Sequence, residues 1–260
     1  MSELTSEGLF IKQNGQIWDL NDLPDGFVIK GDLDLSDKKL EKLPDLSKVT
    51  IEGSFDCFDN QLTSLEGAPQ NVAGSFGCSG NQLTSLKGAP KEVGGDFHCH
   101  RNQLTSLEGA PEKVGGDFCC SDNQLTSLKG APKEVGGFFG CSDNQLTSLE
   151  GAPEKVGGDF SCFYNQLTSL KGAPKEVGGY FSSDVDIAKK YGLGEKFTLD
   201  ELKASELYIK ENKQEMIDKK AQELKYKLLR VAEENVSPEK GVRSDVIKAV
   251  MEKMTKNIGK

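Results

Sequence analysis

The chain has 260 residues, of which only 36% are hydrophobic and 29 are glycine, so it lacks the apolar content of an ordinary globule of this length. Its formal net charge of −9 disfavours nucleic-acid binding, because an acidic surface repels phosphate, and residues 51–183 hold much of that charge with 16 acidic and 9 basic side chains. No apolar run approaches the roughly 18 residues of a membrane span, and the first residues lack the basic and apolar segments of a signal peptide, so we expect a soluble cytoplasmic protein.

Residues 1–27 are predicted to form an amino-terminal cap. Apolar and polar residues alternate from Leu9 to Trp18 on both sides of Asn14-Gly15, the favoured two-residue turn of a β-hairpin. The first strand of a repeat array needs a cover against edge-to-edge association. We therefore expect a capping hairpin that contains the only tryptophan of the chain.

Residues 28–183 contain a strict internal repeat. The phrase Asn-Gln-Leu-Thr-Ser-Leu recurs every 21 residues without insertion or deletion, beginning at Asn60, Asn81, Asn102, Asn123, Asn144 and Asn165. A constant period is typical of a solenoid in which each repeat is one rung stacked on the previous one. A degenerate first rung lies upstream, with Leu33, Leu35, Leu40 and Leu43 at the apolar positions and Lys38 at the asparagine position. About eight rungs are expected in all.

Each repeat predicts one short strand with its apolar side chains inward. In one copy, Phe97 and Cys99 alternate as they would in a strand, and Leu104, Leu107, Ala110 and Val114 complete the apolar lining. The asparagine that follows the strand, Asn102, can bond backbone groups of its own rung and the next, which predicts an asparagine ladder. Six cysteines recur once per rung, at Cys57, Cys78, Cys99, Cys120, Cys141 and Cys162, and are expected to be reduced structural thiols.

This spacing resembles the leucine-rich repeat signature. The short Asn-x-Leu-Thr-Ser-Leu-x-x-x-Pro motif is most similar to the repeats of type III-secreted bacterial effectors. The Gly-Ala-Pro-x-x-Val-Gly-Gly motif is similar to repeats of bacteriophage-encoded proteins. The resemblance covers residues 28–183 and implies a solenoid of short parallel strands and turns that acts as a binding scaffold. Effectors of this type can carry a ubiquitin-ligase domain with a cysteine nucleophile, but residues 163–260 contain neither Cys nor His. We therefore expect a chain that is not an enzyme.

Two columns of charge alternate from rung to rung. The residue after the second leucine reads Glu66, Lys87, Glu108, Lys129, Glu150 and Lys171, and the second residue after proline reads Asn71, Glu92, Lys113, Glu134, Lys155 and Glu176. Stacked rungs lie about 4.8 Å apart, so opposite charges become neighbours and a one-rung slip would bring like charges together. We interpret these columns as register control on a solvated face.

Residues 184–260 are predicted to be α-helical. Thr198-Leu-Asp-Glu201 is a capping box that opens a helix, and Ile217, Ala221, Leu224, Leu228 and Val231 form an amphipathic stripe. Ser237-Pro238 ends this pattern, and a final helix is expected from about Ser244 to Lys256. These helices are expected either to cap the last rung or to form a dimerising coiled coil.

The candidate binding site follows from the outward strand positions, which vary while the remainder of the repeat is constant. Exposed aromatic side chains there suggest partner anchors, although internal packing is the alternative interpretation. His98, His100 and Cys119 share one side of neighbouring strands, but they lack a fourth zinc ligand, so a polar patch is favoured and neither a metal nor a cofactor is predicted. The predicted partner-binding residues are Phe58, Asp59, His98, His100, Arg101, Cys119, Asp122, Phe138, Asp143, Phe163, Tyr164 and Tyr180.

The sequence thus favours a non-enzymatic module that binds a protein partner through the strand face. If the phage resemblance holds, the partner is a host protein that the module binds and inhibits in the host cytoplasm. The alternative is a self-associating or virion-attached scaffold that uses the carboxy-terminal helices. Neither nucleic acid nor a membrane is expected as a partner of the repeats.

Overall fold

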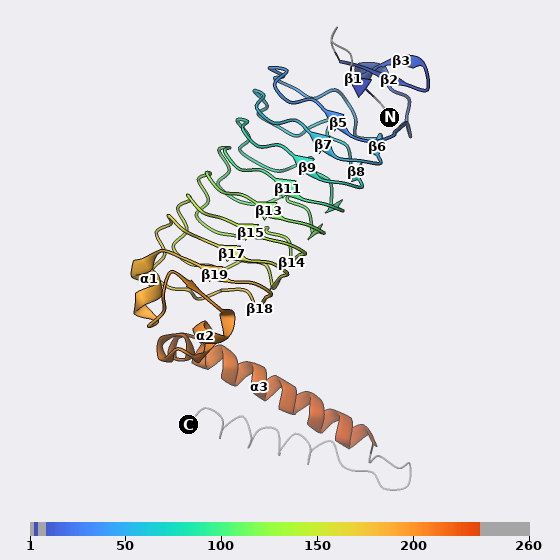
Figure 1. Cartoon of the computed structure of the whole chain (residues 1–260). Helices are drawn as coiled ribbons and strands as arrows, with labels where there is room; N and C mark the ends of the chain where they lie inside the picture. The colour runs from blue at the N-terminus through green and yellow to red at the C-terminus, as the bar shows by residue number, and fades with distance from the viewer. Residues whose placement is uncertain (1–2, 5–8, 235–260) are drawn as a thin grey trace. The chain divides into compact units, whose positions relative to one another are not determined.

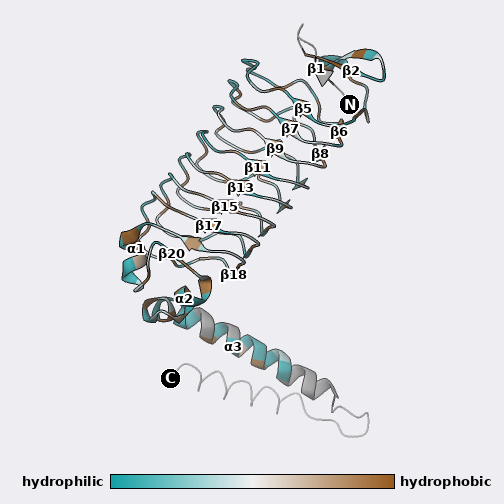
Figure 2. Cartoon of the chain, viewed as in Figure 1, coloured by the Kyte–Doolittle hydropathy of each residue, from teal (hydrophilic) through white to brown (hydrophobic). Residues whose placement is uncertain are grey.

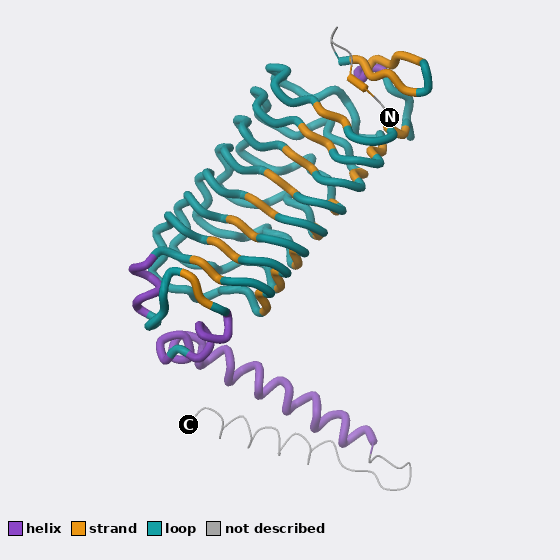
Figure 3. The backbone as a smooth tube through the Cα atoms, viewed as in Figure 1, coloured by secondary structure: helices purple, strands orange, loops and turns teal. Residues whose placement is uncertain are grey.

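The computed structural model describes residues 3–4 and 9–234, and the chain divides into two compact units, Met1–Ser205 and Glu206–Lys260. The first unit is a β-solenoid whose rungs, each one repeat long, stack side by side (Figure 1). Every rung contributes one two-residue strand to each of two parallel sheets, which run as two rows of strands along the stack (Figure 3).

The first of these, the Phe-strand sheet, confirms the predicted strand. Phe97 pairs in register with Phe76 on one side and Phe118 on the other. Its eight parallel strands are β5 (Leu33–Asp34), β7 (Phe55–Asp56), β9 (Phe76–Gly77), β11 (Phe97–His98), β13 (Phe118–Cys119), β15 (Phe139–Gly140), β17 (Phe160–Ser161) and β19 (Phe181–Ser182).

The second, the Val-strand sheet, was not predicted. Val114 was expected only as part of the apolar lining, but it lies in a strand whose preceding residue, Lys113, pairs with Glu92 and Glu134 of the neighbouring rungs. The eight parallel strands are β4 (Val28–Ile29), β6 (Thr50–Ile51), β8 (Asn71–Val72), β10 (Glu92–Val93), β12 (Lys113–Val114), β14 (Glu134–Val135), β16 (Lys155–Val156) and β18 (Glu176–Val177).

The core between the two sheets is a set of continuous side-chain columns. Phe97 and Cys99 are fully buried, as are Leu104 and Leu107, whereas Ala110 is only half-buried. The Phe97 and Phe118 rings stack with their centroids 5.4 Å apart. Hydrophilic and hydrophobic residues alternate along the rungs (Figure 2). A single rung is too thin to fold alone, and burial of its apolar side chains against both neighbouring rungs stabilises it.

The asparagine ladder is present. Each asparagine bonds the preceding rung, whereas the sequence had suggested a bond to the following rung. The Asn102 amide donates to the carbonyls of Cys78, at 3.0 Å, and Cys99, at 3.2 Å. Its oxygen accepts the backbone N–H of Leu83 at 2.9 Å. One buried side chain thereby satisfies backbone groups at the bends of two rungs.

Glycines mark the places where rungs approach most closely. Gly109 has a φ of +91°, which L side chains rarely adopt. A Cβ at Gly94 would collide with the Ala73 carbonyl oxygen of the preceding rung, and one at Gly116 would collide with the Asp96 carboxylate. The low hydrophobic fraction of the chain is therefore in part a packing requirement.

The amino-terminal hairpin is confirmed. It pairs β2 (Phe10–Gln13) with β3 (Gln16–Asp19), and β1 (Glu3–Leu4) adds a third antiparallel strand. The 3₁₀-helix η1 (Leu20–Asp22) follows. The buried Gln13 side chain donates to the Val28 carbonyl and accepts from the Lys30 N–H, both at 2.9 Å. A side-chain amide thus occupies the edge of β4 as another strand would.

At the other end of the first unit, β20 (Lys196–Phe197) pairs antiparallel with β19 and completes the Phe-strand sheet. It lies between α1 (Val185–Lys190) and α2 (Leu199–Ala204), and the Phe197 ring stacks on Phe181 at 5.0 Å. The predicted capping box is confirmed, because Thr198 Oγ1 accepts the Glu201 N–H at 3.2 Å and the Glu201 carboxylate accepts the Thr198 N–H at 2.7 Å. This segment covers the last rung, as expected of a cap.

The second unit contains α3 (Glu206–Glu234). Along the predicted stripe, the Ile217, Ala221 and Leu224 side chains are each half-buried. The final helix predicted from about Ser244 to Lys256 lies outside the described residues. Within the described part of the chain, no helix combines the length and the apolarity needed to cross a membrane.

Candidate interaction surface

The outward surface of the Phe-strand sheet, here called the strand face, consists of four columns of equivalent positions. The pre-Phe column precedes the inward Phe, and the mid-strand column lies between Phe and Cys. The post-Cys and corner columns are the first and second positions after Cys, and the corner column is where the chain leaves the strand. All twelve predicted partner-binding residues lie in these four columns.

The pre-Phe column is a second hydrogen-bond ladder, which the sequence did not reveal. Asp96 accepts the Asp117 backbone N–H at 2.8 Å, and Asp117 accepts the Phe138 N–H at 2.6 Å. Ser54 and Ser75 serve in the same way in earlier rungs, and Asp159 bonds the Tyr180 N–H at 2.8 Å. The Ser and Asp residues in this column are therefore structural acceptors rather than free surface groups.

The corner column imposes a left-handed backbone. From Asp37 to Tyr164 its non-glycine residues have φ values near 50°, including 48° at Asp59 and 54° at both Asp122 and Asp143. Asp, Asn and Gly are the residues that tolerate this conformation best. Arg101, at 54°, and Tyr164, at 53°, are not favoured there, yet both are exposed, and the Tyr164 side chain reaches 71% exposure.

Phe58 and Phe138 are half-buried rather than exposed, because each ring covers a glycine of the mid-strand column. A Cβ at Gly77 would collide with the Phe58 ring from the preceding rung, and one at Gly140 would collide with the Phe138 ring of its own rung. These two aromatic residues therefore pack within the face, which was the alternative interpretation of the sequence.

Two aromatic residues near the carboxy-terminal end of the stack, Tyr164 and Tyr180, are exposed. Phe163 is half-buried, and its ring centroid lies 6.2 Å from that of Tyr164. Tyr180 is 49% exposed, and the Lys196 ammonium lies 4.1 Å from its ring centroid. Tyr164 is thus the most exposed aromatic residue of the strand face.

His98, His100 and Cys119 form a polar patch near the middle of the face. His98 pairs in register with Cys119, and its ring centroid lies 6.0 Å from that of His100. His100 Nδ1 lies 2.9 Å from Ser79 Oγ, and burial lowers the pKa of His100, as do the neighbouring His98 and Arg101 charges. In residues 3–4 and 9–234, no three His, Cys, Asp or Glu side chains are arranged to hold a metal ion.

The six ladder cysteines are reduced and buried, and burial raises the pKa of their thiols. Cys57 Sγ lies 3.2 Å from the Gly77 carbonyl and Cys120 Sγ lies 3.3 Å from the Gly140 carbonyl, so these thiols donate to the following rung. Cys119 is the half-buried exception on the strand face.

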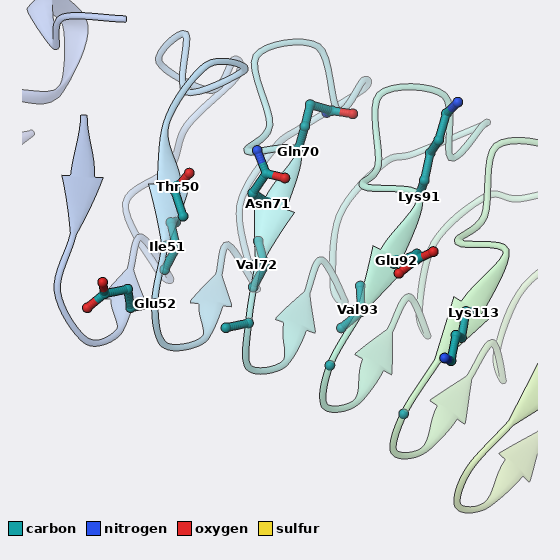
Figure 4. Close-up of a pocket in the computed structure, with 13 residues that line it drawn as sticks. Thr50, Ile51, Glu52, Gln70, Asn71, Val72, Lys91, Glu92, Val93 and Lys113 are labelled. Carbon is teal, nitrogen blue, oxygen red and sulfur yellow. The ribbon is translucent and has the colours of Figure 1, made fainter. Parts of the chain in front are cut away.

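The Val-strand sheet carries an open groove of about 900 Å³ over β6, β8 and β10 (Figure 4). Gly94 and Gly115 lie along it, and packing against the preceding rung excludes a side chain at both positions. Its charged margin includes Lys91, Glu92 and Lys113. The groove is therefore a consequence of rung stacking, and its lining includes none of the twelve predicted partner-binding residues.

Each of the two alternating charge columns forms one ion pair between rungs among the described residues. Lys155 lies 3.3 Å from Glu176, and Lys171 lies 3.5 Å from Glu150. A third column, at the first residue after proline, alternates as well and pairs Lys175 with Glu154 at 2.8 Å. All of these side chains are solvated, so each pair adds only about 0.2–1 kcal/mol.

Comparison with known proteins adds no family to this description. No model of a known protein family, no curated protein and no solved structure matches the chain. The repeat length and the parallel strands are compatible with a short-repeat fold like that of leucine-rich repeat proteins. Any function must therefore be argued from the surface itself.

Proposed function

We propose that this chain is a non-enzymatic module that binds a protein partner through the strand face. The observation that carries this proposal is the presence of Arg101 and Tyr164 in the corner column. Both side chains extend into solvent from a backbone conformation that disfavours them, in a repeat whose other positions follow packing needs. A residue kept against local backbone preference is a candidate for function rather than for stability.

The repeat sequence resembles that of bacteriophage-encoded proteins, which suggests a host protein as the partner. The module would bind and inhibit that protein in the host cytoplasm. An exposed aromatic ring and a guanidinium are typical of the side chains that dominate protein interfaces.

The test uses the double variant Arg101→Asn with Tyr164→Asn, because Asn suits the left-handed backbone and the fold should persist. The immobilised wild-type chain is expected to capture a partner from bacterial lysate, and the double variant is expected to lose it. The matched control is Gln103→Ala with Gln166→Ala, which alters exposed residues of the same rungs outside the strand face. Equal capture by the wild-type chain and the double variant would contradict the proposal.

A scaffold that self-associates through its helices is the second candidate. In α3, Ile209 is 44% exposed and Tyr226 is 66% exposed, so both side chains are accessible to a second copy of the chain. Sedimentation of the full chain would distinguish the two candidates. A monomer at micromolar concentration argues against the scaffold, whereas an oligomer that Ile209→Lys with Tyr226→Lys dissociates would favour it.

A further inference from the structure

The carboxylates of Asp122 and Asp143 have no structural task. Both side chains are exposed, and neither has a hydrogen-bond or salt-bridge partner among the described residues. By contrast, the pre-Phe aspartates each accept a backbone N–H. Asn or Gly would satisfy the left-handed corner equally well, so the fold does not require the charge of these two residues.

The strand face as a whole is acidic. Only one basic residue, Arg101, stands in its four columns, and it forms no salt bridge with Asp122. The eleven acidic residues are Asp32, Asp34, Asp37, Asp56, Asp59, Asp96, Asp117, Asp122, Asp143, Asp159 and Asp184. Burial raises the pKa of Asp143, and the nearby carboxylates of Asp122 and Asp184 raise it further. A cation placed here would relieve that repulsion.

The next residue of the corner column after these two aspartates carries an exposed aromatic ring. Tyr164 follows Asp143 in the corner column, one rung or about 4.8 Å further along the stack. Its backbone N–H is held by Asp184 at 2.9 Å, which fixes the chain where the exposed ring projects. A planar guanidinium can bond carboxylates with two parallel N–H groups and also stack on an aromatic face, whereas an ammonium offers only a point charge.

We infer that the strand face binds an arginine-rich segment of its protein partner, with a guanidinium held between the Asp122 and Asp143 carboxylates and the Tyr164 ring. This inference rests on the proposed function and specifies the chemistry of the partner. The acidic sheet face supplies charge complementarity along the segment, and the corner column supplies the preference for arginine over lysine.

The test measures the affinity of the full-length chain for two peptides at 0.15 M salt by fluorescence anisotropy. One peptide alternates arginine with glycine, and the other replaces each arginine with lysine. The arginine peptide is expected to bind at least about fivefold more tightly than the lysine peptide. Tyr164→Asn should reduce that preference to less than about twofold, because the ring is lost while the backbone is accommodated.

Charge-matched variants separate the site from the net charge of the protein. Asp122→Asn with Asp143→Asn should weaken arginine-peptide binding at least about fivefold, and Glu108→Gln with Glu134→Gln, which removes the same two charges elsewhere, should weaken it less than about twofold. Equal losses in the two variants, or no preference for arginine, would overturn the inference. If lysate capture is lost with Arg101→Asn and Tyr164→Asn but survives Asp122→Asn with Asp143→Asn, the proposed function stands and the arginine-rich partner is wrong.

Discussion

Asp117 and Asp122 lie five residues apart in one rung, in two outward columns that vary similarly along the sequence, but they differ in what they do. The Asp117 carboxylate bonds the Phe138 backbone of the next rung, whereas the Asp122 carboxylate has no such partner among the described residues. Variation in a repeat column therefore does not by itself indicate a binding surface. A column can vary between Ser and Asp because either accepts the same hydrogen bond.

The largest expected effect lies beneath both columns, in the asparagine ladder. Asn102→Ala leaves the buried Leu83 N–H without its acceptor. It also removes one of the two donors to each of the Cys78 and Cys99 carbonyls, which keep Asn81 and Asn123, so it should lower the free energy of unfolding by about 2 kcal/mol. Urea denaturation followed by circular dichroism would measure the loss. The exposed neighbour Gln103→Ala should change stability by less than about 0.5 kcal/mol. A loss below about 1 kcal/mol for Asn102→Ala would mean that the ladder contributes little to the stability of the stack.

The difference between the structural roles of the two aspartates can be tested directly. Asp117→Ala should cost about 1.5 kcal/mol, because the Phe138 N–H loses a charged acceptor at 2.6 Å. Asp122→Asn should leave the unfolding free energy within about 0.5 kcal/mol of the wild-type value, since the left-handed backbone accepts Asn. If the two substitutions had equal effects in the same urea titration, the distinction between a structural column and a free column would fail.

A smaller effect tests whether charge on the strand face opposes folding. Burial raises the pKa of Asp56 to about 6, and the nearby Asp34 and Asp32 carboxylates contribute. Because the folded-state pKa is above its ordinary value of 3.8, the ionised carboxylate destabilises the fold above pH 6, and the penalty disappears as the pH falls towards 4. Asp56→Asn should therefore stabilise the protein by about 1 kcal/mol at pH 7.5, allowing for solvent screening, and have almost no effect at pH 4.

Thermal unfolding at the two pH values would measure this difference. The control is Ser161→Asn, because Ser161 lies in the same mid-strand column and has no carboxylate. Its effect on stability should not depend on pH. A stabilisation by Asp56→Asn that is the same at both pH values would contradict the electrostatic explanation.

The sequence predicted the features that depend on residues within one repeat. Phe97 and Cys99 alternate over enough residues to indicate a strand, Asn14-Gly15 specifies its own turn, and Thr198 with Glu201 forms a local cap. The Val strands escaped prediction because a two-residue strand with a single inward side chain has no period to detect.

Features that depend on contacts between rungs were harder to predict from the sequence. The hydrogen bond from the Phe138 N–H to Asp117 and the position of the Phe58 ring over Gly77 both require the stacking register. The twelve candidate residues lie in the four columns of one face, but the exposure of each side chain could not be derived from the sequence pattern. The unfavoured φ of Arg101 and Tyr164 could have been suspected, because the same column elsewhere contains Asp and Gly.

The alternating charge columns have a consequence for how such a chain can change length. In three columns the sign of the charge reverses from one charged residue to the next, as it does from Lys113 to Glu134 and from Glu134 to Lys155, which are neighbours in the Val-strand sheet. Gain or loss of one repeat would place like charges together at the junction in every column, whereas gain or loss of two would restore the pattern. The unit of duplication that the solenoid accepts without electrostatic penalty is therefore 42 residues, twice the 21-residue spacing of the phrase. Chains of this kind are expected to differ in length by even numbers of rungs.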